Sequence, residues 1–244
     1  MTAAIVSGHS RGLGAALAAE LLQRGVSVLG LARAGNAALA AQFPARFEQV
    51  ALDLADSAAL AQWLDGPALA RFAGGHARVL LANVAGSLQP VGPVEGLDTR
   101  RIAAAVALNV AAPLMLTSAL VAATPASERR VVHVSSGAAR KPYVGWSVYC
   151  ATKAALDHHA RALALEGRAD LRVCSLAPGV LDTAMQAEVR ASSAEDFPMR
   201  ERFVELQRSG SLVDPAVAAK QLVDYWFSDD FGTDPVADLR DLPR

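Results

Sequence analysis

The sequence contains few of the residues that hold small or metal-dependent proteins together. Cys150 and Cys174 are the only cysteines among its 244 residues. Two thiols are too few for a disulfide framework or a thiolate metal site, so we expect two free thiols and no bound metal. Folding must therefore rest on a hydrophobic core, and an apolar content of 52% is enough to build a large one.

The sequence also lacks an excess of charge of either sign. Its 23 Lys and Arg residues nearly balance its 24 Asp and Glu residues. This balance argues against a nucleic-acid-binding surface and against a polybasic membrane-binding segment. No charged leader with an apolar run opens the chain, and its longer apolar stretches are broken by polar residues. We therefore expect a cytoplasmic protein that binds small molecules.

Short apolar runs rich in β-branched residues alternate with helical patterns along the chain. The patterns predict strands at 3–7, 26–32, 48–52, 78–82, 131–134, 171–176 and 236–239, and helices at 15–24, 36–42, 98–123, from Tyr149 to about 167, and 215–227. Such alternation is typical of a single α/β domain, here 1–244, with a parallel sheet covered on both faces. The polar segment 183–212 has scattered apolar anchors, and we expect it to form a substrate lid.

A glycine-rich turn joins the first strand to the first helix. Its candidate cofactor contacts are Gly8, Ser10, Arg11, Gly12, Leu13 and Gly14. Glycines let the backbone turn sharply and approach a pyrophosphate, whose charge the N-terminus of the helix favours. The position of the turn between a strand and a helix therefore favours a dinucleotide site over a plain connection.

The same turn also matches the G-x-S-x-G nucleophile elbow of serine hydrolases, with Ser10 as the nucleophile. In α/β-hydrolases that elbow follows several earlier strands of the sheet, and an acidic residue and then a histidine come later in the chain. Here it follows the first strand, and the last histidines, His158 and His159, fall within a helix. A hydrolase stays a second, less favoured hypothesis.

The end of the second strand bears on the choice of cofactor. Arg33 stands where an acidic residue would hydrogen-bond the ribose 2′-hydroxyl of NAD. An arginine there suits a 2′-phosphate, and Arg11 can supply a second cation, so we predict NADPH/NADP. Arg33 as an ordinary solvated loop residue is the alternative. Asp53 and Leu54 end the third strand, where a carboxylate can meet the adenine amino group.

Two further segments complete the predicted pocket. Asn83, Ala85 and Gly86 form a small-residue turn after the fourth strand, where backbone can lie against the cofactor ribose. The helix at 98–123 is apolar around most of its circumference, which predicts packing on the sheet and on the same helix of a second subunit. Asn109 in this helix is either a satisfied core amide or a member of the active site.

The chemistry is predicted in the stretch from Val131 to Lys153. Tyr149 and Lys153 are spaced i, i+4 and therefore share one helical face. A phenol with an ordinary pKa near ~10 exchanges protons poorly at neutral pH, and a nearby ammonium can lower that pKa. Ser136 ends the preceding strand, where its side chain can face the same crevice.

Taken together, these residues resemble the short-chain dehydrogenase/reductase family over essentially the whole chain. The matching motifs are Gly8-x-x-x-Gly12-x-Gly14, Asn83-x-Ala85-Gly86, Asn109, Ser136, Tyr149-x-x-x-Lys153 and Pro178-Gly179. Val84 and Ser7 depart from the family's usual Asn and Thr. The resemblance implies a Rossmann fold with a doubly wound, seven-stranded parallel sheet and a nicotinamide cofactor, which Pro178, Gly179, Val180 and Thr183 would also contact.

The resemblance also implies the residue roles. Tyr149 would protonate the substrate carbonyl oxygen and Ser136 would hydrogen-bond it. Lys153 would lower the pKa of Tyr149 and hold the nicotinamide ribose. Asn109 would keep a water in a proton relay that ends at Lys153. The protein would thus be an oxidoreductase. From the apolar helix at 98–123 we expect a homodimer or homotetramer.

Within the family, residues 178–186 and the Ser10-Arg11 pair look most like the sepiapterin reductase and benzil reductase branch. That branch implies reduction of a ketone or vicinal dicarbonyl with NADPH. Asp238 resembles the acid that anchors the pterin in the branch, although a surface carboxylate is the simpler interpretation. A nucleotide-sensing protein that binds NADPH without turnover remains a third hypothesis, against which the complete set of catalytic residues argues.

Overall fold

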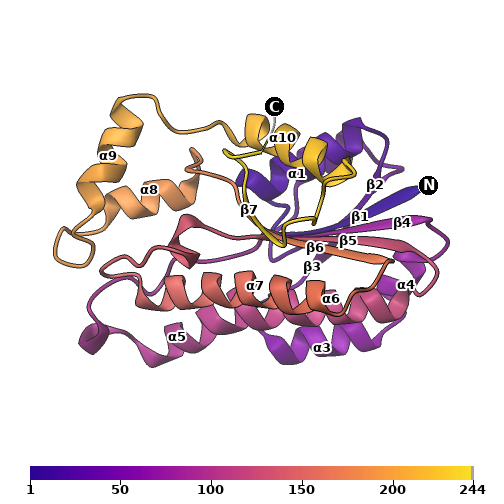
Figure 1. Cartoon of the computed structure of the whole chain (residues 1–244), viewed down its shortest axis with the longest axis horizontal. Helices are drawn as coiled ribbons and strands as arrows, with labels where there is room; N and C mark the ends of the chain where they lie inside the picture. Colours follow the sequence, from indigo (N-terminus) through magenta and orange to yellow (C-terminus); the bar gives the residue numbers. More distant parts are fainter. Residues whose placement is uncertain (243–244) are drawn as a thin grey trace.

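The computed structural model describes residues 1–242, which form one seven-stranded sheet between two layers of helices (Figure 1). The strands are β1 (Thr2–Ser7), β2 (Ser27–Ala32), β3 (Phe47–Ala51), β4 (Arg78–Asn83), β5 (Glu128–Val134), β6 (Leu171–Ala177) and β7 (Val236–Asp238). All pairings are parallel, in the order β3-β2-β1-β4-β5-β6-β7. This confirms the predicted doubly wound Rossmann architecture. The order reverses between β1 and β4, which creates a crevice at the carboxyl ends of the strands.

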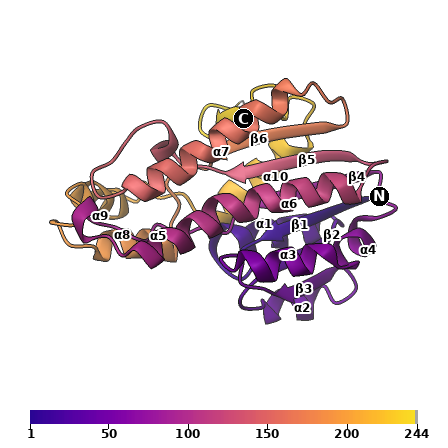
Figure 2. The same ribbon diagram turned by 90° about the horizontal axis from the view of Figure 1, so that it is seen from below.

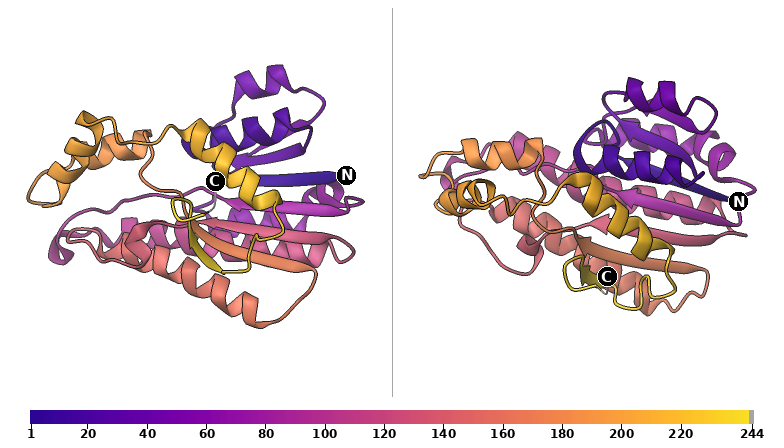
Figure 3. Two further views of the ribbon diagram at one scale, coloured as in Figure 1. Left: turned by 45° about the horizontal axis from the view of Figure 1, so that its top comes forward. Right: turned by 90° about the horizontal axis from the view of Figure 1, so that it is seen from above.

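Each face of the sheet has its own apolar core. On one face, α1 (Gly12–Gln23), α2 (Ala37–Gln42) and α10 (Pro215–Phe227) pack against residues such as Val6, Leu17 and Leu222. The other face is covered by α3 (Ser57–Asp65), α4 (Ala68–Ala73), α6 (Ala112–Ala123) and α7 (Ser147–Leu165). The core on this face contains Ile5 and Leu116 among others. Figure 2 shows α6 and α7 side by side across this second face, and Figure 3 shows α1 and α10 over the first.

The helix predicted at 98–123 is divided in the structure. It consists of α5 (Thr99–Val106), a π-helical turn η2 (Ala107–Ala111) and α6. Thr99–Ala123 is long and apolar enough to cross a membrane by length and composition alone. However, Ala112, Leu116 and Leu120 are buried in the core of the second face. The helix is therefore apolar because it packs against the sheet.

Two features between the predicted elements were missed. No helix was predicted between Leu54 and the fourth strand, but this segment contains α3 and α4. The fifth strand begins at Glu128, before the predicted Val131, because Arg129 and Arg130 are buried in it. Arg129 pairs with Asp170, and Arg130 donates to Glu128 at 2.7 Å and to the carbonyl of Trp226 at 2.7 Å.

The segment predicted at 183–212 contains two short helices, α8 (Ala184–Ala191) and α9 (Arg200–Arg208). They lie beyond the carboxyl ends of the strands, away from the two helical layers (Figure 1). Phe197 and Phe203 from this segment pack with Trp146 and Tyr149 in a third, smaller apolar cluster. The segment is thereby held directly above the edge of the sheet where the crevice opens.

Candidate active site

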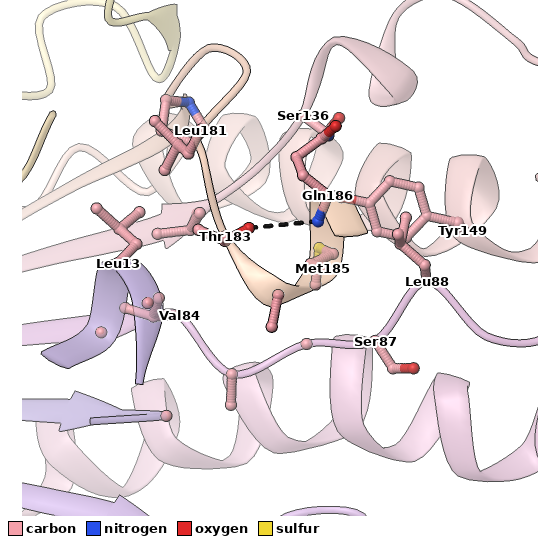
Figure 4. A pocket seen from close by; sticks show the side chains of 18 of the residues that line it. Leu13, Val84, Ser87, Leu88, Ser136, Tyr149, Leu181, Thr183, Met185 and Gln186 are labelled. Atoms are coloured by element: carbon pink, nitrogen blue, oxygen red, sulfur yellow. Dashed lines mark hydrogen bonds between the residues drawn. The ribbon is translucent and has the colours of Figure 1, made fainter. Parts of the chain in front are cut away.

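A cavity of about 830 Å³ opens at the carboxyl edge of the sheet and brings most of the predicted site together. Of the predicted residues it is lined by Gly8, Ser10, Arg11, Gly12, Leu13, Gly14, Arg33, Asp53, Leu54, Ala85, Gly86, Ser136, Tyr149, Lys153, Pro178, Gly179, Val180 and Thr183. Figure 4 shows Leu13 and Val84 toward one side and Ser136 and Tyr149 toward the other. The volume lies in the range of cofactor and ligand sites.

The glycine turn provides a cradle for an anion. Gly8 and Gly12 have φ angles of +75° and +56°, a backbone conformation that residues other than glycine rarely adopt. A Cβ on Gly14 would lie 2.1 Å from the carbonyl oxygen of Gly8, so the helix can start this close to β1 only with glycine there. The N-terminus of α1 has no side-chain cap and no acidic residue in its first turn. Its free N–H groups and helix dipole therefore fit a pyrophosphate.

The turn after β4 is held against the glycine turn by Ser7. The Ser7 hydroxyl accepts hydrogen bonds from the backbone N–H groups of Val84 at 2.9 Å and Ala85 at 3.1 Å. Ser7 therefore supplies the hydroxyl that a threonine would supply at the same position. A Cβ on Gly8 would lie 3.0 Å from Ala85, which shows how closely the two turns pack.

Asn83 is the exception among the predicted cofactor contacts. Its side chain does not line the cavity but is buried, 3.0 Å from His133 and 3.5 Å from Thr117. Side chains alternate between the faces of a strand, and this one points into the helical layer. The Asn83 side chain therefore holds the turn against the neighbouring strand and helix, and the predicted contact of the turn's backbone with the cofactor ribose stays a prediction.

Asn109 lies in the π-helical turn and is also fully buried. Its Oδ1 accepts from the Ser87 N–H at 2.9 Å, while its Nδ2 donates to the Ser87 carbonyl at 2.8 Å and to Thr152 Oγ1 at 3.1 Å. The side chain is thus a satisfied core amide, the first of the two predicted alternatives, and does not line the cavity. It joins the β4 turn to α7, and its part in a proton relay stays a prediction.

Tyr149 and Ser136 approach the cavity from neighbouring elements. Ser136 caps the short helix η3 (Gly137–Ala139), where its Oγ accepts from the Ala138 N–H at 3.1 Å. The cap does not use the O–H of Ser136, which can donate to the Tyr149 oxygen or to a bound substrate. Burial raises the pKa of Tyr149 to about 12, although a hydrogen bond with Ser136 opposes the shift. At neutral pH the phenol therefore keeps its proton, as a proton donor must.

Lys153 lies one turn further along α7, with its Nζ 5.7 Å from the centre of the Tyr149 ring. The ammonium donates to the Val134 carbonyl at 2.7 Å. Burial lowers the pKa of Lys153 to about 8, against the attraction of Asp157. Burial is the main cause of the raised Tyr149 pKa, and the lowering of that pKa by Lys153 stays a prediction.

Asp157 was not predicted, yet it organises this edge of the sheet. It accepts hydrogen bonds from Ser135 at 2.6 Å and Ser175 at 2.7 Å, and it pairs with Arg140 at 3.1 Å. Its position one turn after Lys153 was the only signal in the sequence. The network ties β5, β6 and α7 together beside Tyr149 and Lys153.

Asp238, for which a surface carboxylate was the simpler interpretation, is buried and lines the cavity. Arg240 donates to it at 2.6 Å and 2.8 Å, and these bonds lower the pKa of the carboxyl. The carboxylate is thus paired with a neighbouring arginine. Tyr143, Trp146, Met185, Gln186 and Phe203 also line the cavity and were not singled out from the sequence as site residues.

Ser10, the nucleophile of the hydrolase hypothesis, lacks the partner that it would need. Among residues 1–242, no hydrogen bond joins its hydroxyl to a histidine. His9, next to it, instead lies 3.0 Å from Gln49, and His133 pairs with His159 at 3.1 Å in the helical layer. The turn therefore suits an anion cradle better than a nucleophile elbow.

Comparison with known proteins agrees with this geometry. The family model described as short chain dehydrogenase matches residues 2–194. A benzil reductase ((S)-benzoin forming) from Bacillus cereus is 33% identical, over 89% of this chain and 91% of its own. A sepiapterin reductase from Meriones unguiculatus is 37% identical, over 97% and 95% of the two chains.

Solved structures lead to the same family. A crystal structure of a short-chain dehydrogenase/reductase from Burkholderia vietnamiensis is 49% identical, with a TM-score of 0.72 over 99% of this chain and 98% of that one. The chain thus belongs to the short-chain dehydrogenase/reductase family of oxidoreductases, in the branch of the benzil and sepiapterin reductases.

Proposed function

We propose that the protein is an NADPH-dependent carbonyl reductase that acts on a ketone or a vicinal dicarbonyl compound. The observation that carries the proposal is the presence of Ser136, Tyr149 and Lys153 in the cavity that also contains the uncapped N-terminus of α1. A proton donor and an anion cradle in one cavity suit reduction by a phosphate-bearing nicotinamide cofactor. The names of the benzil and sepiapterin reductase relatives support the substrate class.

The mechanism assigns one role to each side chain. The reduced nicotinamide, when bound, supplies a hydride for the carbonyl carbon. The Tyr149 phenol gives its proton to the carbonyl oxygen, on which negative charge develops. Ser136 donates its free O–H to the same oxygen and stabilises that charge. The Lys153 ammonium, which has two N–H donors beyond its bond to Val134, favours the phenolate that remains.

The preference for NADP over NAD rests on Arg11 and Arg33. Both line the cavity, and neither forms an ion pair within residues 1–242. Two free cations with no nearby carboxylate partner suit a 2′-phosphate. Relatives of this fold vary: a dehydrogenase from Sphingobium yanoikuyae was solved with NADPH and a 4-hydroxyisoleucine dehydrogenase with NADH, both under 25% identical to this chain. The preference must therefore be tested on this protein.

The substrate end of the cavity is apolar and aromatic. Leu88, Tyr143, Trp146, Met185, Phe203 and Leu206 line it. Such walls favour ketones with apolar or aromatic substituents. We further propose that α8 and α9 form the substrate lid, and that Asp238 contacts substrate only if Arg240 releases it.

The direct test mixes purified protein, NADPH and a 1,2-diketone such as benzil and follows absorbance at the reduced nicotinamide band. We expect the absorbance to fall and the hydroxyketone to accumulate. A protein that binds NADPH but turns over none of a panel of ketones and diketones would favour the sensor hypothesis. Labelling of Ser10 by a fluorophosphonate probe would instead favour a hydrolase.

We propose a homodimer or homotetramer in the cytoplasm, built on the face of α5, α6 and α7. Val106 on α5 is 43% exposed and Leu165 on α7 is 88% exposed, although both are large and apolar. Apolar side chains on one helical layer are typical of a subunit interface. Light scattering at micromolar concentration should give at least twice the mass of the 25.4 kDa chain. A monomer would contradict this arrangement.

The pH dependence of the reaction should follow Lys153 rather than Tyr149. The pKa values of about 8 and about 12 mean that raising the pH removes the ammonium charge long before the phenol ionises. We expect kcat/KM to fall as pH rises through about 8 and to be level below it. The Lys153→Arg variant, if active, should not show this limb, because a guanidinium stays charged. A profile that is level to pH 10 would contradict the assignment.

A further inference from the structure

Gln49 on β3 contacts two segments that lie far from it in the chain. Its Oε1 accepts a hydrogen bond from the backbone N–H of Asn36 at 2.6 Å and lies 3.0 Å from Nε2 of His9. His9 belongs to the glycine turn, and Asn36 ends the loop that follows β2. One carboxamide oxygen therefore joins the segment that carries Arg11 to the segment that carries Arg33.

The backbone settles the direction of both hydrogen bonds. A backbone N–H can only donate, so the side-chain atom of Gln49 that faces Asn36 is the oxygen. Because this oxygen only accepts, Nε2 of His9 carries the hydrogen and donates it. Burial lowers the pKa of His9, so the ring is neutral at neutral pH. His9 is fully buried and does not line the cavity, and it thus serves as a fixed donor to Gln49.

A glycine in β2 makes room for the His9 ring. Gly30 is the register partner of Gln49 on the neighbouring strand, and a Cβ on Gly30 would lie 2.4 Å from Cγ of His9. The imidazole therefore occupies the space over β2 that a side chain would fill, and from there it reaches Gln49. Phe47 contacts the imidazole edge to face, with ring centres 5.5 Å apart. Packing thus fixes the direction in which His9 donates.

The loop between β2 and α2 carries Arg33 and ends at Asn36. Asn36 is held twice, because its N–H donates to Gln49 while its side chain accepts from the Leu39 N–H at 3.1 Å and caps α2. A Cβ on Gly35 would lie 3.2 Å from Oε1 of Gln49, so the loop passes close to this oxygen. Arg33 is exposed and lines the cavity. The place of its guanidinium therefore depends on the backbone that Gln49 holds.

We propose that Gln49 is a positioning residue that fixes the distance between the pyrophosphate cradle and the 2′-phosphate site, with His9 as its link to the glycine turn. This inference rests on the proposed function, in which the glycine turn holds the pyrophosphate and Arg33 binds the 2′-phosphate. A ligand with a phosphate at each place binds better when their distance is fixed in advance. A ligand with a phosphate at the cradle alone does not benefit.

The test compares 2′,5′-ADP, which has a phosphate for each place, with 5′-AMP, which lacks the 2′-phosphate. Calorimetric titration gives both Kd values and needs no turnover. Gln49→Met keeps the length of the side chain but removes the oxygen. We expect the Kd for 2′,5′-ADP to rise about tenfold, the usual effect of one lost hydrogen bond, and that for 5′-AMP to stay unchanged. Gln62→Met, which replaces an exposed glutamine of α3 outside the cavity, is the control and should change neither value.

A double-mutant cycle separates positioning from packing. If Gln49 acts through Arg33, then Gln49→Met should not weaken 2′,5′-ADP binding further once Arg33→Ala is present. Additive losses in the double variant, or equal losses for both nucleotides, would mean that Gln49 only stabilises the fold and would overturn the proposal. His9→Phe keeps a buried ring without the donor, and it should raise the Kd for 2′,5′-ADP in the same direction as Gln49→Met.

Hydrogen exchange on the unaltered protein decides the proposal if these variants fail to fold. The Asn36 amide should exchange more slowly with saturating 2′,5′-ADP than with saturating 5′-AMP, because the 2′-phosphate holds the loop in the arrangement that Gln49 fixes. Equal exchange rates would overturn the proposal.

The benzil assay keeps this inference separate from the proposed function. If benzil is reduced with NADPH while Gln49→Met leaves the ratio of the two Kd values unchanged, the reductase stands and the role of Gln49 is refuted. If no ketone is reduced but the ratio changes as expected, the reductase is refuted and the role of Gln49 stands.

Discussion

Replacing Tyr149 with phenylalanine is expected to reduce kcat for carbonyl reduction by at least about a hundredfold, the usual contribution of a positioned proton donor. The substitution removes one oxygen atom and keeps the ring, which contacts Trp146 at 5.5 Å. Burial holds the pKa of the phenol at about 12, so the unaltered protein carries the transferred proton at any physiological pH. The variant lacks that proton entirely.

Cofactor binding should survive this substitution, because the pyrophosphate cradle lies at the N-terminus of α1 and not at Tyr149. Fluorescence titration with NADPH should therefore give a similar Kd for both proteins. Tyr225→Phe is the matched control: this phenol lies outside the cavity and accepts a hydrogen bond from the Gly232 N–H at 3.3 Å. Turnover by Tyr149→Phe at more than a tenth of the normal rate would refute the role of the phenol.

Replacing Arg33 with aspartate is expected to reverse the cofactor preference, with the ratio of kcat/KM for NADPH to that for NADH falling by about a hundredfold or more. A charge-assisted hydrogen bond contributes about 1.5–3 kcal/mol, and its loss alone accounts for a factor of about 10 to 100. The new carboxylate adds repulsion of the 2′-phosphate. It can also accept a hydrogen bond from the 2′-hydroxyl of NADH.

The effect should be confined to the cofactor, because Arg33 lies at the end of β2 while Tyr149 lies on α7. The control is Arg46→Asp, which removes an exposed arginine outside the cavity and should leave the ratio unchanged. Kinetics with both cofactors at low ionic strength measure the ratio with least screening. If Arg33→Asp keeps the original ratio, the phosphate binds elsewhere, and Arg11 becomes the first residue to test.

The regions where structure and sequence analysis differ share a physical cause. The strand prediction did not extend to Arg129 and Arg130, because buried charge is rare. In the structure, backbone carbonyls and the carboxylate of Glu128 compensate for the burial of the two arginines. α3 and α4 are short and Ala-rich, and such helices are marginal without a tertiary partner. Neither the partners of a charge nor the surface on which a short helix packs can be read from local pattern.

Asn83 and Asn109 illustrate the same limit at the site. Both belong to motifs of the predicted site, and both amides face neighbouring elements instead of the cavity. The direction of Asn83 depends on the register of β4 against β5, and that of Asn109 depends on a π-helical turn.

The sequence by itself determined the alternation of strands and helices, the glycine turn and the i, i+4 pairing of Tyr149 with Lys153. These features depend on periodicity and on backbone conformations that only glycine adopts, and both are local properties. The tertiary structure decided which polar groups are buried together, which of them are left unpaired and how far burial shifts the pKa of Tyr149. Those properties depend on residues distant in the chain, whose proximity is settled only when the sheet assembles.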